Sequence, residues 1–242
     1  MFSHDLLNHI KNAKSIVALT GAGISAESGV PTFRGENGLW KNHKPEELAN
    51  AQAFLRNPKL VWEWYHYRRD IIKKVNPNPG HYALVKLEEY SPEFTLITQN
   101  VDNLHKLAGS RNIKELHGNI MRNRCVDCNR RYEINEIPDS DIPRCSCGGM
   151  IRPDVVLFGD LLPADALNES IYAARNCDLF MSIGTSALVQ PAASLPIEAK
   201  NYGAYVVEIN FEKTVISSLV DVSIPGKSGE ILPELIKALG IE

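Results

Sequence analysis

Residues 15–40 read SIVALTGAGISAESGVPTFRGENGLW, and this stretch decides the fold. The apolar run at 15–20 is typical of a buried strand, and a glycine-rich turn follows it directly. Glycine permits a tight turn and lets the backbone approach a ligand that a Cβ atom would keep away. The spacing Gly21-x-Gly23-x-x-Ala26 fits the dinucleotide-binding fingerprint with alanine in the third place. We therefore predict a strand and a phosphate-binding turn, with a purely structural glycine turn as the alternative.

The segment after this turn departs from an ordinary dinucleotide-binding fold. In that fold a long helix would follow, and then a second strand that ends in a ribose-binding acid. Here Gly29, Pro31, Gly35 and Gly38 break up any helix. We therefore expect a loop that takes part in ligand binding itself.

The composition is that of a soluble globular protein. A chain of 242 residues suffices for one large α/β domain, or for a main domain with a small insert. Its residues are 44% hydrophobic and 23% charged, and no apolar run approaches the roughly 18 residues of a membrane span. The first residues resemble neither a secretion signal nor an organelle presequence, so a cytoplasmic location is expected. A net charge of −3 gives no general attraction to nucleic acid.

Strand and helix patterns alternate along the chain. Apolar runs predict strands at 15–20, 94–98, 179–183, 204–209 and 221–225. Helical patterns occur at 6–13, 58–75, 80–89, 164–175, 192–201 and 230–239. On the long helix the residues spaced for burial are Leu60, Val61, Trp64, Ile71 and Ile72. The alternation predicts an α/β fold, a Rossmann-like doubly wound parallel sheet with helices on both faces.

One domain spanning 1–242 is expected to contain three parts. Residues 119–155 are rich in Cys, Arg, Pro and Gly and show little helical period, which indicates a small insert outside the main sheet. The segment 39–81 forms a helical part. The Rossmann-like part comprises 1–38, 82–118 and 156–242.

Four of the five cysteines lie in the insert. They form Cys125-x2-Cys128 and, after sixteen residues, Cys145-x-Cys147. Two turns that each offer a pair of thiolates are typical of a zinc ribbon, whose structural Zn ion has no open position for catalysis. The second pair is one residue tighter than usual, and two following glycines let that turn adapt. Free thiols or a redox pair are the alternatives, while Cys177 is expected to be a buried apolar residue.

Polar residues gather where the predicted strands end. The sequence Gln99-Asn100-Val101-Asp102-Asn103 follows one strand, and Gly184-Thr185-Ser186 follows another. Ligands bind outside the carboxyl ends of the strands in open parallel sheets. His117, between a strand-like piece and a glycine, can face the same cleft and accept a proton near neutral pH. A structural role is the alternative for this histidine, as it is for His81.

Three further histidines lie in polar surroundings and are expected to be solvated: His4, His9 and His43. No G-x-S-x-G motif and no second His or Ser arrangement supports a hydrolase triad.

Several motifs occur together in an order that resembles one family, the sirtuins, which are NAD-dependent protein lysine deacylases. The resemblance covers nearly the whole chain. The motifs are Gly21-Ala22-Gly23-Ile24-Ser25, Gly29-Val30-Pro31, Phe33-Arg34-Gly35, Thr98-Gln99-Asn100-Val101-Asp102-Asn103-Leu104-His105, His117-Gly118, the four cysteines, Phe158-Gly159-Asp160, Gly184-Thr185-Ser186 and Glu208-Ile209-Asn210.

The resemblance implies that NAD lies across the strand ends and is consumed as a co-substrate. The acyl-lysine carbonyl oxygen would attack C1′ of the ribose, and His117 would be the general base that activates a ribose hydroxyl. Free lysine, nicotinamide and O-acyl-ADP-ribose would result. The implied cofactor contacts are Gly21, Ala22, Gly23, Ser25, Ala26, Thr32, Phe33, Arg34, Trp40, Gln99, Asn100, Val101, Asp102, Gly184, Thr185, Ser186, Asn210, Lys227 and Ser228. The implied substrate contacts are Tyr65, Arg68, Val156, Phe158 and Gly159.

The acyl preference depends on Tyr65 and Arg68. They resemble the Tyr-x-x-Arg pair of the desuccinylase branch, in which a phenol and a guanidinium bind the distal carboxylate of an acidic acyl group. At i and i+3 both side chains share one helix face, and Arg can bind a carboxylate bidentately. Thr32, where many deacetylases carry Asp, points to the same branch, whereas Asp160 departs from the commoner Glu. The alternative is an amphipathic core helix with Tyr65 buried and Arg68 solvated.

The leading hypothesis is an NAD-dependent deacylase that removes succinyl, malonyl and acetyl groups from lysine. The expected partners are acylated proteins, and a monomer without membrane association is favoured. A deacetylase without acidic-acyl activity and a mono-ADP-ribosyltransferase are the alternatives within enzymes. A zinc-ribbon module that binds nucleic acid or protein is the alternative from a different class, but acids interleave with the arginines of the insert, so no stripe of one charge results.

Overall fold

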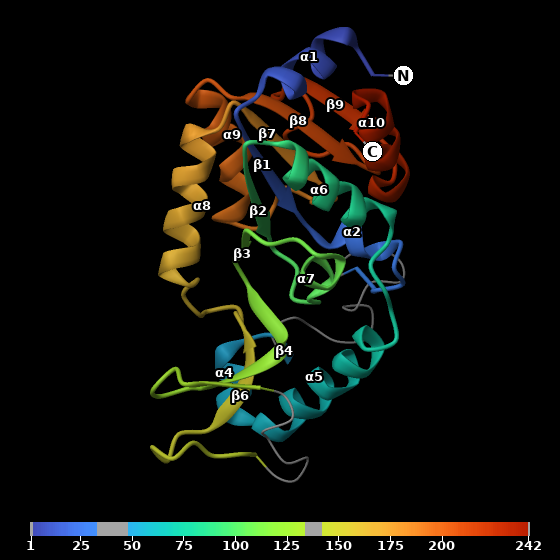
Figure 1. Ribbon diagram of the computed structural model, residues 1–242. Helices are drawn as coiled ribbons and strands as arrows, with labels where there is room; N and C mark the ends of the chain where they lie inside the picture. Colours follow the sequence, from blue (N-terminus) through green and yellow to red (C-terminus); the bar gives the residue numbers. More distant parts are fainter. Residues whose placement is uncertain (1, 33–47, 134–141, 242) are drawn as a thin grey trace.

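A six-stranded parallel sheet forms the centre of the larger lobe (Figure 1). The computed structural model describes residues 2–32, 48–133 and 142–241. The strand order β3-β2-β1-β7-β8-β9 is that of a doubly wound Rossmann-like sheet, so the predicted fold class is confirmed. The strands are β1 (Ser15–Thr20), β2 (Glu93–Thr98), β3 (Ile113–Glu115), β7 (Leu179–Ile183), β8 (Tyr205–Asn210) and β9 (Val222–Pro225).

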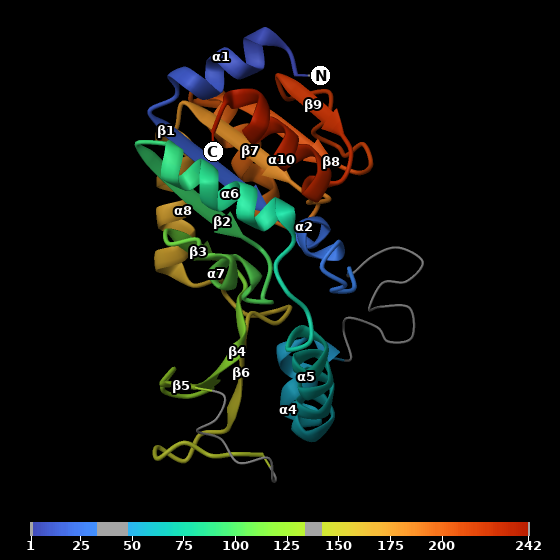
Figure 2. The ribbon, with the colours of Figure 1, turned by 45° about the vertical axis from the view of Figure 1, so that its right-hand side comes forward.

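Helices cover both faces of this sheet because its central strands are apolar on both sides. Ile16 and Ala18 of β1 face one core, and Val17 and Leu19 face the other. The first core is covered by α1 (His4–Asn12), α6 (Pro79–Tyr90) and α10 (Ser228–Leu239). The second core is covered by α8 (Ala164–Asn176) and α9 (Leu195–Asn201). Figure 2 shows the two layers on either side of the strands.

A small lobe lies below the carboxyl ends of these strands (Figures 1 and 2). We define it as α4 (Ala51–Arg56), α5 (Pro58–Ile72) and the antiparallel sheet β5-β4-β6. The strands of this sheet are β4 (Gly118–Cys125), β5 (Arg131–Glu133) and β6 (Ile151–Val155). Helix α5 packs Val61, Trp62 and Tyr65 into a core shared with this sheet.

The structure corrects several details of the sequence prediction. Helix α5 ends at Ile72 rather than near Val75, and Leu60, expected to be buried, is 41% exposed. The expected helix at 192–201 divides into a 3₁₀ turn, η3 (Ala192–Ser194), and α9. After the glycine turn a helix does form, but α2 (Ala22–Ala26) has only five residues before Gly29 adopts a φ of +89°.

The short elements of the chain were not located by sequence patterns. These are α4, the strands of the small sheet, and α7 (Leu104–Ala108), whose flanking Asn103 and Gly109 are both left-handed. The structural roles expected for Cys177 and His81 fit the structure, since both are buried and His81 Nδ1 accepts the Asn78 N–H in a capping box. His4 and His9 are exposed, and His43 lies outside the described residues. No helix in the described part of the chain is long and apolar enough to cross a membrane.

Candidate active site

A cavity of about 920 Å³ lies at the carboxyl ends of β1, β2, β7 and β8 and extends to the small lobe. In a doubly wound sheet this is the edge at which ligands bind. Most of the residues singled out by the sequence line it: Gly21, Ala22, Gly23, Ala26, Thr32, Tyr65, Arg68, Gln99, Asn100, Val101, His117, Val156, Phe158, Gly159, Gly184, Thr185, Ser186, Asn210, Lys227 and Ser228. Phe33, Arg34 and Trp40 lie outside the described residues.

The glycine turn is packed against a second glycine turn. A Cβ atom on Gly21 would lie 2.7 Å from the Gly184 carbonyl oxygen, and one on Gly23 would lie 2.7 Å from the Gly184 Cα. The Gly23 N–H donates to that same carbonyl oxygen at 2.8 Å, and Gly184 itself has a φ of +58°. The glycines therefore allow the ends of β1 and β7 to meet, in addition to leaving the cavity wall free of side chains.

Ser25 and Asp102 lie behind the wall, and Asn100 connects them to the cavity. Asn100 Nδ2 donates to the Gly21 carbonyl oxygen at 3.0 Å and to Ser25 Oγ at 3.1 Å. Burial raises the pKa of Asp102, against hydrogen bonds from the Leu104 N–H and the Ser25 hydroxyl. The three side chains thus form one hydrogen-bonded chain between α2 and the segment that follows β2.

His117 faces the cavity from the turn before β4. Its Nδ1 lies 3.0 Å from the Gln99 carbonyl oxygen. A carbonyl oxygen can only accept, so Nδ1 carries the proton and Nε2 is left with its lone pair. Burial lowers the pKa of His117, although the hydrogen bond to Gln99 opposes this. The neutral imidazole is therefore the favoured form at neutral pH, with Nε2 able to accept a proton.

Tyr65 and Arg68 form the far wall of the cavity, on α5. They are 1% and 5% exposed, so the alternative in which Arg68 is solvated is wrong. The guanidinium carbon of Arg68 lies 5.0 Å from the Trp64 ring centroid and 5.7 Å from that of Tyr65. Burial lowers the pKa of Arg68, and the nearby Asp102 carboxyl group opposes this. Burial raises the pKa of Tyr65 to about 12, so its phenol remains protonated.

Several lining residues were missed by sequence reasoning. Glu27 accepts the Gly229 N–H at 2.8 Å and so joins the end of α2 to the first turn of α10. Phe211 follows the expected Asn210, and nothing in their sequence marks either Glu27 or Phe211 as a wall residue. The other lining residues that the sequence did not single out are Ala49, Val155, Leu157, Leu162, Val189, Gln190, Glu212 and Gly226, whereas Asp160 and Ile209 were quoted within motifs without an assigned contact.

The four cysteines of the insert meet at one point of the small lobe. All four sulfur atoms lie within 4.8 Å of one another, and the Sγ atoms are 3.5 Å apart for Cys125 and Cys147 and 3.6 Å for Cys128 and Cys145. A tetrahedral ion with Zn–S bonds of about 2.3 Å needs sulfurs about 3.8 Å apart, so the cluster fits one structural zinc. Tyr132 Oη donates to Cys145 Sγ at 2.9 Å. None of these cysteines lines the cavity.

We expect the purified protein to contain about one zinc per chain, and Cys128→Ser to lose it, because three thiolates bind the ion much more weakly than four. Elemental analysis measures the metal content directly. Thermal unfolding should show a lower midpoint for this variant. Cys177→Ser is the control, since Cys177 is a buried thiol outside the cluster and its replacement should leave the zinc content unchanged. A zinc-free wild-type protein would contradict this assignment.

The fold and the cavity define a Rossmann-like α/β protein whose site lies where the strands end. The profile of the Sir2 family matches residues 21–191. A protein of Aquifex aeolicus (strain VF5), named NAD-dependent protein deacylase, is 54% identical over 220 residues, 88% of this chain and 90% of that protein. This chain therefore belongs to the Sir2 family.

Solved structures agree with this assignment over the whole chain. A Sir2 homologue in complex with NAD is 45% identical, with a TM-score of 0.93 over 99% of this chain and 94% of that one. A complex of Sir2 with a p53 peptide and NAD+ is 32% identical, with a TM-score of 0.90 over 100% of both chains. Because this is an enzyme family, a zinc-ribbon binding module does not describe the chain as a whole.

Proposed function

We propose that this chain is an NAD-dependent protein lysine deacylase that accepts acidic as well as neutral acyl groups. The observation that carries the proposal is a single cavity that joins the glycine turn, the neutral His117 and the Tyr65–Arg68 wall. Relatives with the deacylase name and structures with NAD and a peptide support it. Mono-ADP-ribosyl transfer would use the same cofactor, but no feature of the site favours it.

The cavity suits a dinucleotide at its sheet end. Gly21, Gly23 and Gly184 leave a wall of backbone there, and Asn210 at the end of β8 offers an amide for ribose hydroxyls. Lys227 would face the adenosine end, and the Asn100–Ser25–Asp102 chain would hold the carboxamide of nicotinamide. When bound, NAD supplies an activated ribose carbon that receives the acyl-lysine oxygen as nicotinamide leaves.

His117 would then supply the general base. Its Nδ1–H bond to Gln99 fixes the ring orientation and leaves Nε2 directed away from that carbonyl. Because burial keeps the imidazole neutral, Nε2 is ready to take the proton of a ribose hydroxyl.

The acidic-acyl preference rests on the burial of Arg68. Arg68 lines the cavity with its guanidinium buried, and the protonated phenol of Tyr65 belongs to the same wall. A distal carboxylate on the acyl group would accept from both side chains, as charge-assisted pairs do. Succinyl-lysine and malonyl-lysine carry such a carboxylate, whereas acetyl-lysine does not.

The function is tested by incubating the protein with NAD and matched peptides that carry acetyl-lysine or succinyl-lysine. Nicotinamide release and deacylation are followed separately. We expect both peptides to be deacylated. If neither reacts, the deacylase proposal fails, and if only the acetyl peptide reacts, the acidic-acyl proposal fails. Nicotinamide release with ADP-ribose on protein and no deacylation would support the transferase alternative.

We expect Arg68→Met to lower kcat/KM for the succinyl peptide by about 100-fold, because one charge-assisted contact of about 1.5–3 kcal/mol is lost. The acetyl reaction should change by less than about threefold, since methionine fills a similar volume without the charge. Steady-state kinetics with both peptides give the ratio. Lys73→Met, an exposed cation at the end of the same helix, should leave both reactions unchanged. Equal losses on both peptides would point to a packing role.

A cytoplasmic location and a monomeric enzyme remain part of this proposal. All five cysteines are free thiols, and four of them form the metal cluster, which suits a reducing compartment such as the cytoplasm. One chain supplies every group that the proposed reaction uses, which is consistent with a monomeric enzyme acting on acylated proteins.

A further inference from the structure

The segment 156–160 forms the cavity wall between β6 and α8, and its backbone is held on two sides. The Val156 N–H donates to the His117 carbonyl oxygen at 2.9 Å. Phe158 pairs with residues 49–51 of the other wall, its N–H donating to the Ala49 carbonyl oxygen at 2.7 Å. Its ring is half exposed, and Gly159 has a φ of +93°. The segment therefore presents a fixed edge toward the cavity.

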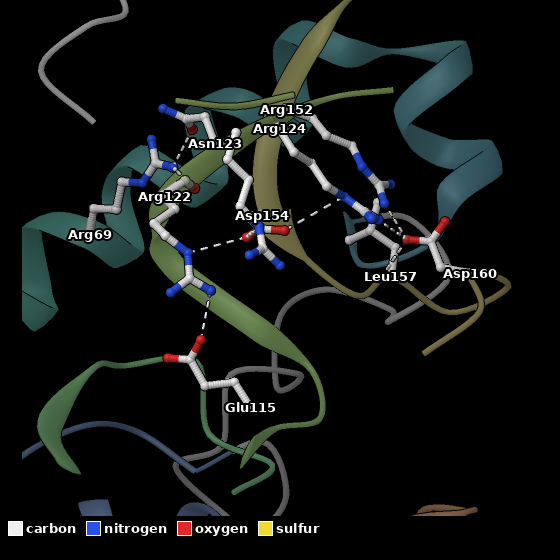
Figure 3. Close-up of polar contacts among 10 residues, drawn as sticks. Arg69, Glu115, Arg122, Asn123, Arg124, Arg152, Asp154, Leu157 and Asp160 are labelled. Atoms are coloured by element: carbon white, nitrogen blue, oxygen red, sulfur yellow. Dashed lines mark hydrogen bonds and ion pairs between the residues drawn. The ribbon is translucent and has the colours of Figure 1, made fainter. Parts of the chain in front are cut away.

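Asp160 makes the third attachment, and it does so through its side chain. Asp160 Oδ2 accepts the Leu157 N–H at 2.9 Å, while the Asp160 N–H donates to the Leu157 carbonyl oxygen at 2.9 Å. The same carboxylate oxygen is paired with Arg152 and, at 3.3 Å, with Arg124. Figure 3 shows both guanidinium groups converging on Asp160 from the strands of the small lobe.

The two arginines differ in whether they also lie near a second carboxylate. Arg124 also lies 3.8 Å from Asp154, which in turn pairs with Arg122 at 3.2 Å. Arg152 is 5% exposed, and Asp160 is its ion-pair partner among the described residues. Breaking a buried pair by removing one partner leaves a costly unpaired charge. The Arg152–Asp160 pair is therefore the strong link between β6 and the segment 156–160.

We propose that Asp160 is a positioning residue for the acylated peptide: its carboxylate, fixed by Arg152 and Arg124, sets the position of residues 157–159 along the wall. The proposal rests on the proposed deacylase function. In this role the Asp160 side chain need not touch the acyl group. Its ion pairs join the small antiparallel sheet, which carries the four cysteines, to the cavity wall formed by residues 156–160. The glycine turn at 21–23 follows β1 and contacts Gly184 after β7, so the backbone bonds that hold it do not involve the Arg152–Asp160 pair.

The test is the Asp160→Asn variant, assayed with NAD and an acetyl-lysine peptide. Asparagine keeps the size but cannot neutralise Arg152. We expect the KM for the peptide to rise by about tenfold, the effect of losing one charge-assisted hydrogen bond, while the KM for NAD changes less than about twofold. The dissociation constant of a fluorescent peptide, measured by anisotropy, should rise by the same factor. Asp160→Glu keeps the charge and should recover most of the loss.

Two controls separate positioning from general stability. Asp178→Asn removes a carboxylate that likewise accepts backbone N–H groups, those of Lys14 and Ser15, at the opposite edge of the sheet, and it should change neither KM. Arg152→Met and Asp160→Asn should be strongly non-additive when combined, since both remove one link. Equal increases in both KM values, or a lower melting temperature with unchanged peptide affinity, would overturn the proposal. An inactive wild-type protein would instead overturn the deacylase function.

Discussion

We expect His117→Ala to reduce deacylation by about 1000-fold or more while the protein keeps its fold, because general bases contribute roughly 10² to 10⁴ in rate and no other imidazole lines the cavity in the described residues. The ring makes one polar contact, to the Gln99 carbonyl oxygen, so its loss should cost little stability. Deacylation is followed by mass change of an acyl-lysine peptide, and the fold by circular dichroism. His4→Ala, an exposed histidine of α1, serves as the control.

The pH dependence of the wild-type enzyme tests the same role. Burial lowers the pKa of His117 below its ordinary value of about 6.5, so the neutral base persists to lower pH than for a solvated histidine. The acid limb of the kcat/KM profile should therefore have its midpoint below about pH 6.5. An acid limb that begins well above pH 6.5, or a His117→Ala variant with near-normal activity, would contradict the assignment.

The second large effect is expected at Arg69, the neighbour of Arg68 on α5. Arg69 is almost fully buried and donates to the Ile120 carbonyl oxygen at 2.6 Å, the Arg122 carbonyl oxygen at 3.1 Å and Asn123 Oδ1 at 2.5 Å. Figure 3 shows its guanidinium directed at β4. Arg69→Met removes this donor from two buried acceptors and one partly buried acceptor, and we expect the free energy of unfolding to fall by about 3 kcal/mol or more.

Chemical denaturation with urea measures this loss. Arg56→Met replaces an exposed arginine of α4 in the same lobe and should shift the free energy of unfolding by no more than about 0.5 kcal/mol. The pair thus distinguishes a structural arginine from a surface one. A wild-type midpoint for Arg69→Met would show that the bulge in β4, where the register with β6 shifts between Asn119 and Asn123, does not depend on this guanidinium.

The sequence predicted the large sheet well because its strands are continuous apolar runs. Buried on both faces, β1 and β7 contain few polar residues, and their ends are marked by Gly21 and Gly184. The strands of the small sheet carry no such signal. In β4 and β6 the residues Arg124, Arg152 and Asp154 point into an ion-pair network, so the strands read as polar loop although they are largely buried.

The site was predicted where each residue type is fixed by a local motif. Ion pairs between residues far apart in the sequence were not predicted. Asp160 and Arg124 lie 36 positions apart, and no periodicity relates them. Arg68 illustrates the same limit. Helix periodicity alone favours a solvated arginine at this position. Its burial results from the packing of α5 against β6 and from the proximity of Asp102, which follows β2. Such placements follow from tertiary contacts rather than from local sequence.

The position of β1 in the middle of the large sheet has a consequence for biosynthesis. Its partners are β2, translated next among the strands, and β7, which follows much later: the hydrogen bond from the Lys14 N–H to Asp178 spans 164 positions. Pairings over such distances form slowly, and the backbone N–H and C=O groups along one edge of β1 stay without their β7 partners until β7 has left the ribosome. The glycine turn is therefore translated well before the strand that completes its native surroundings.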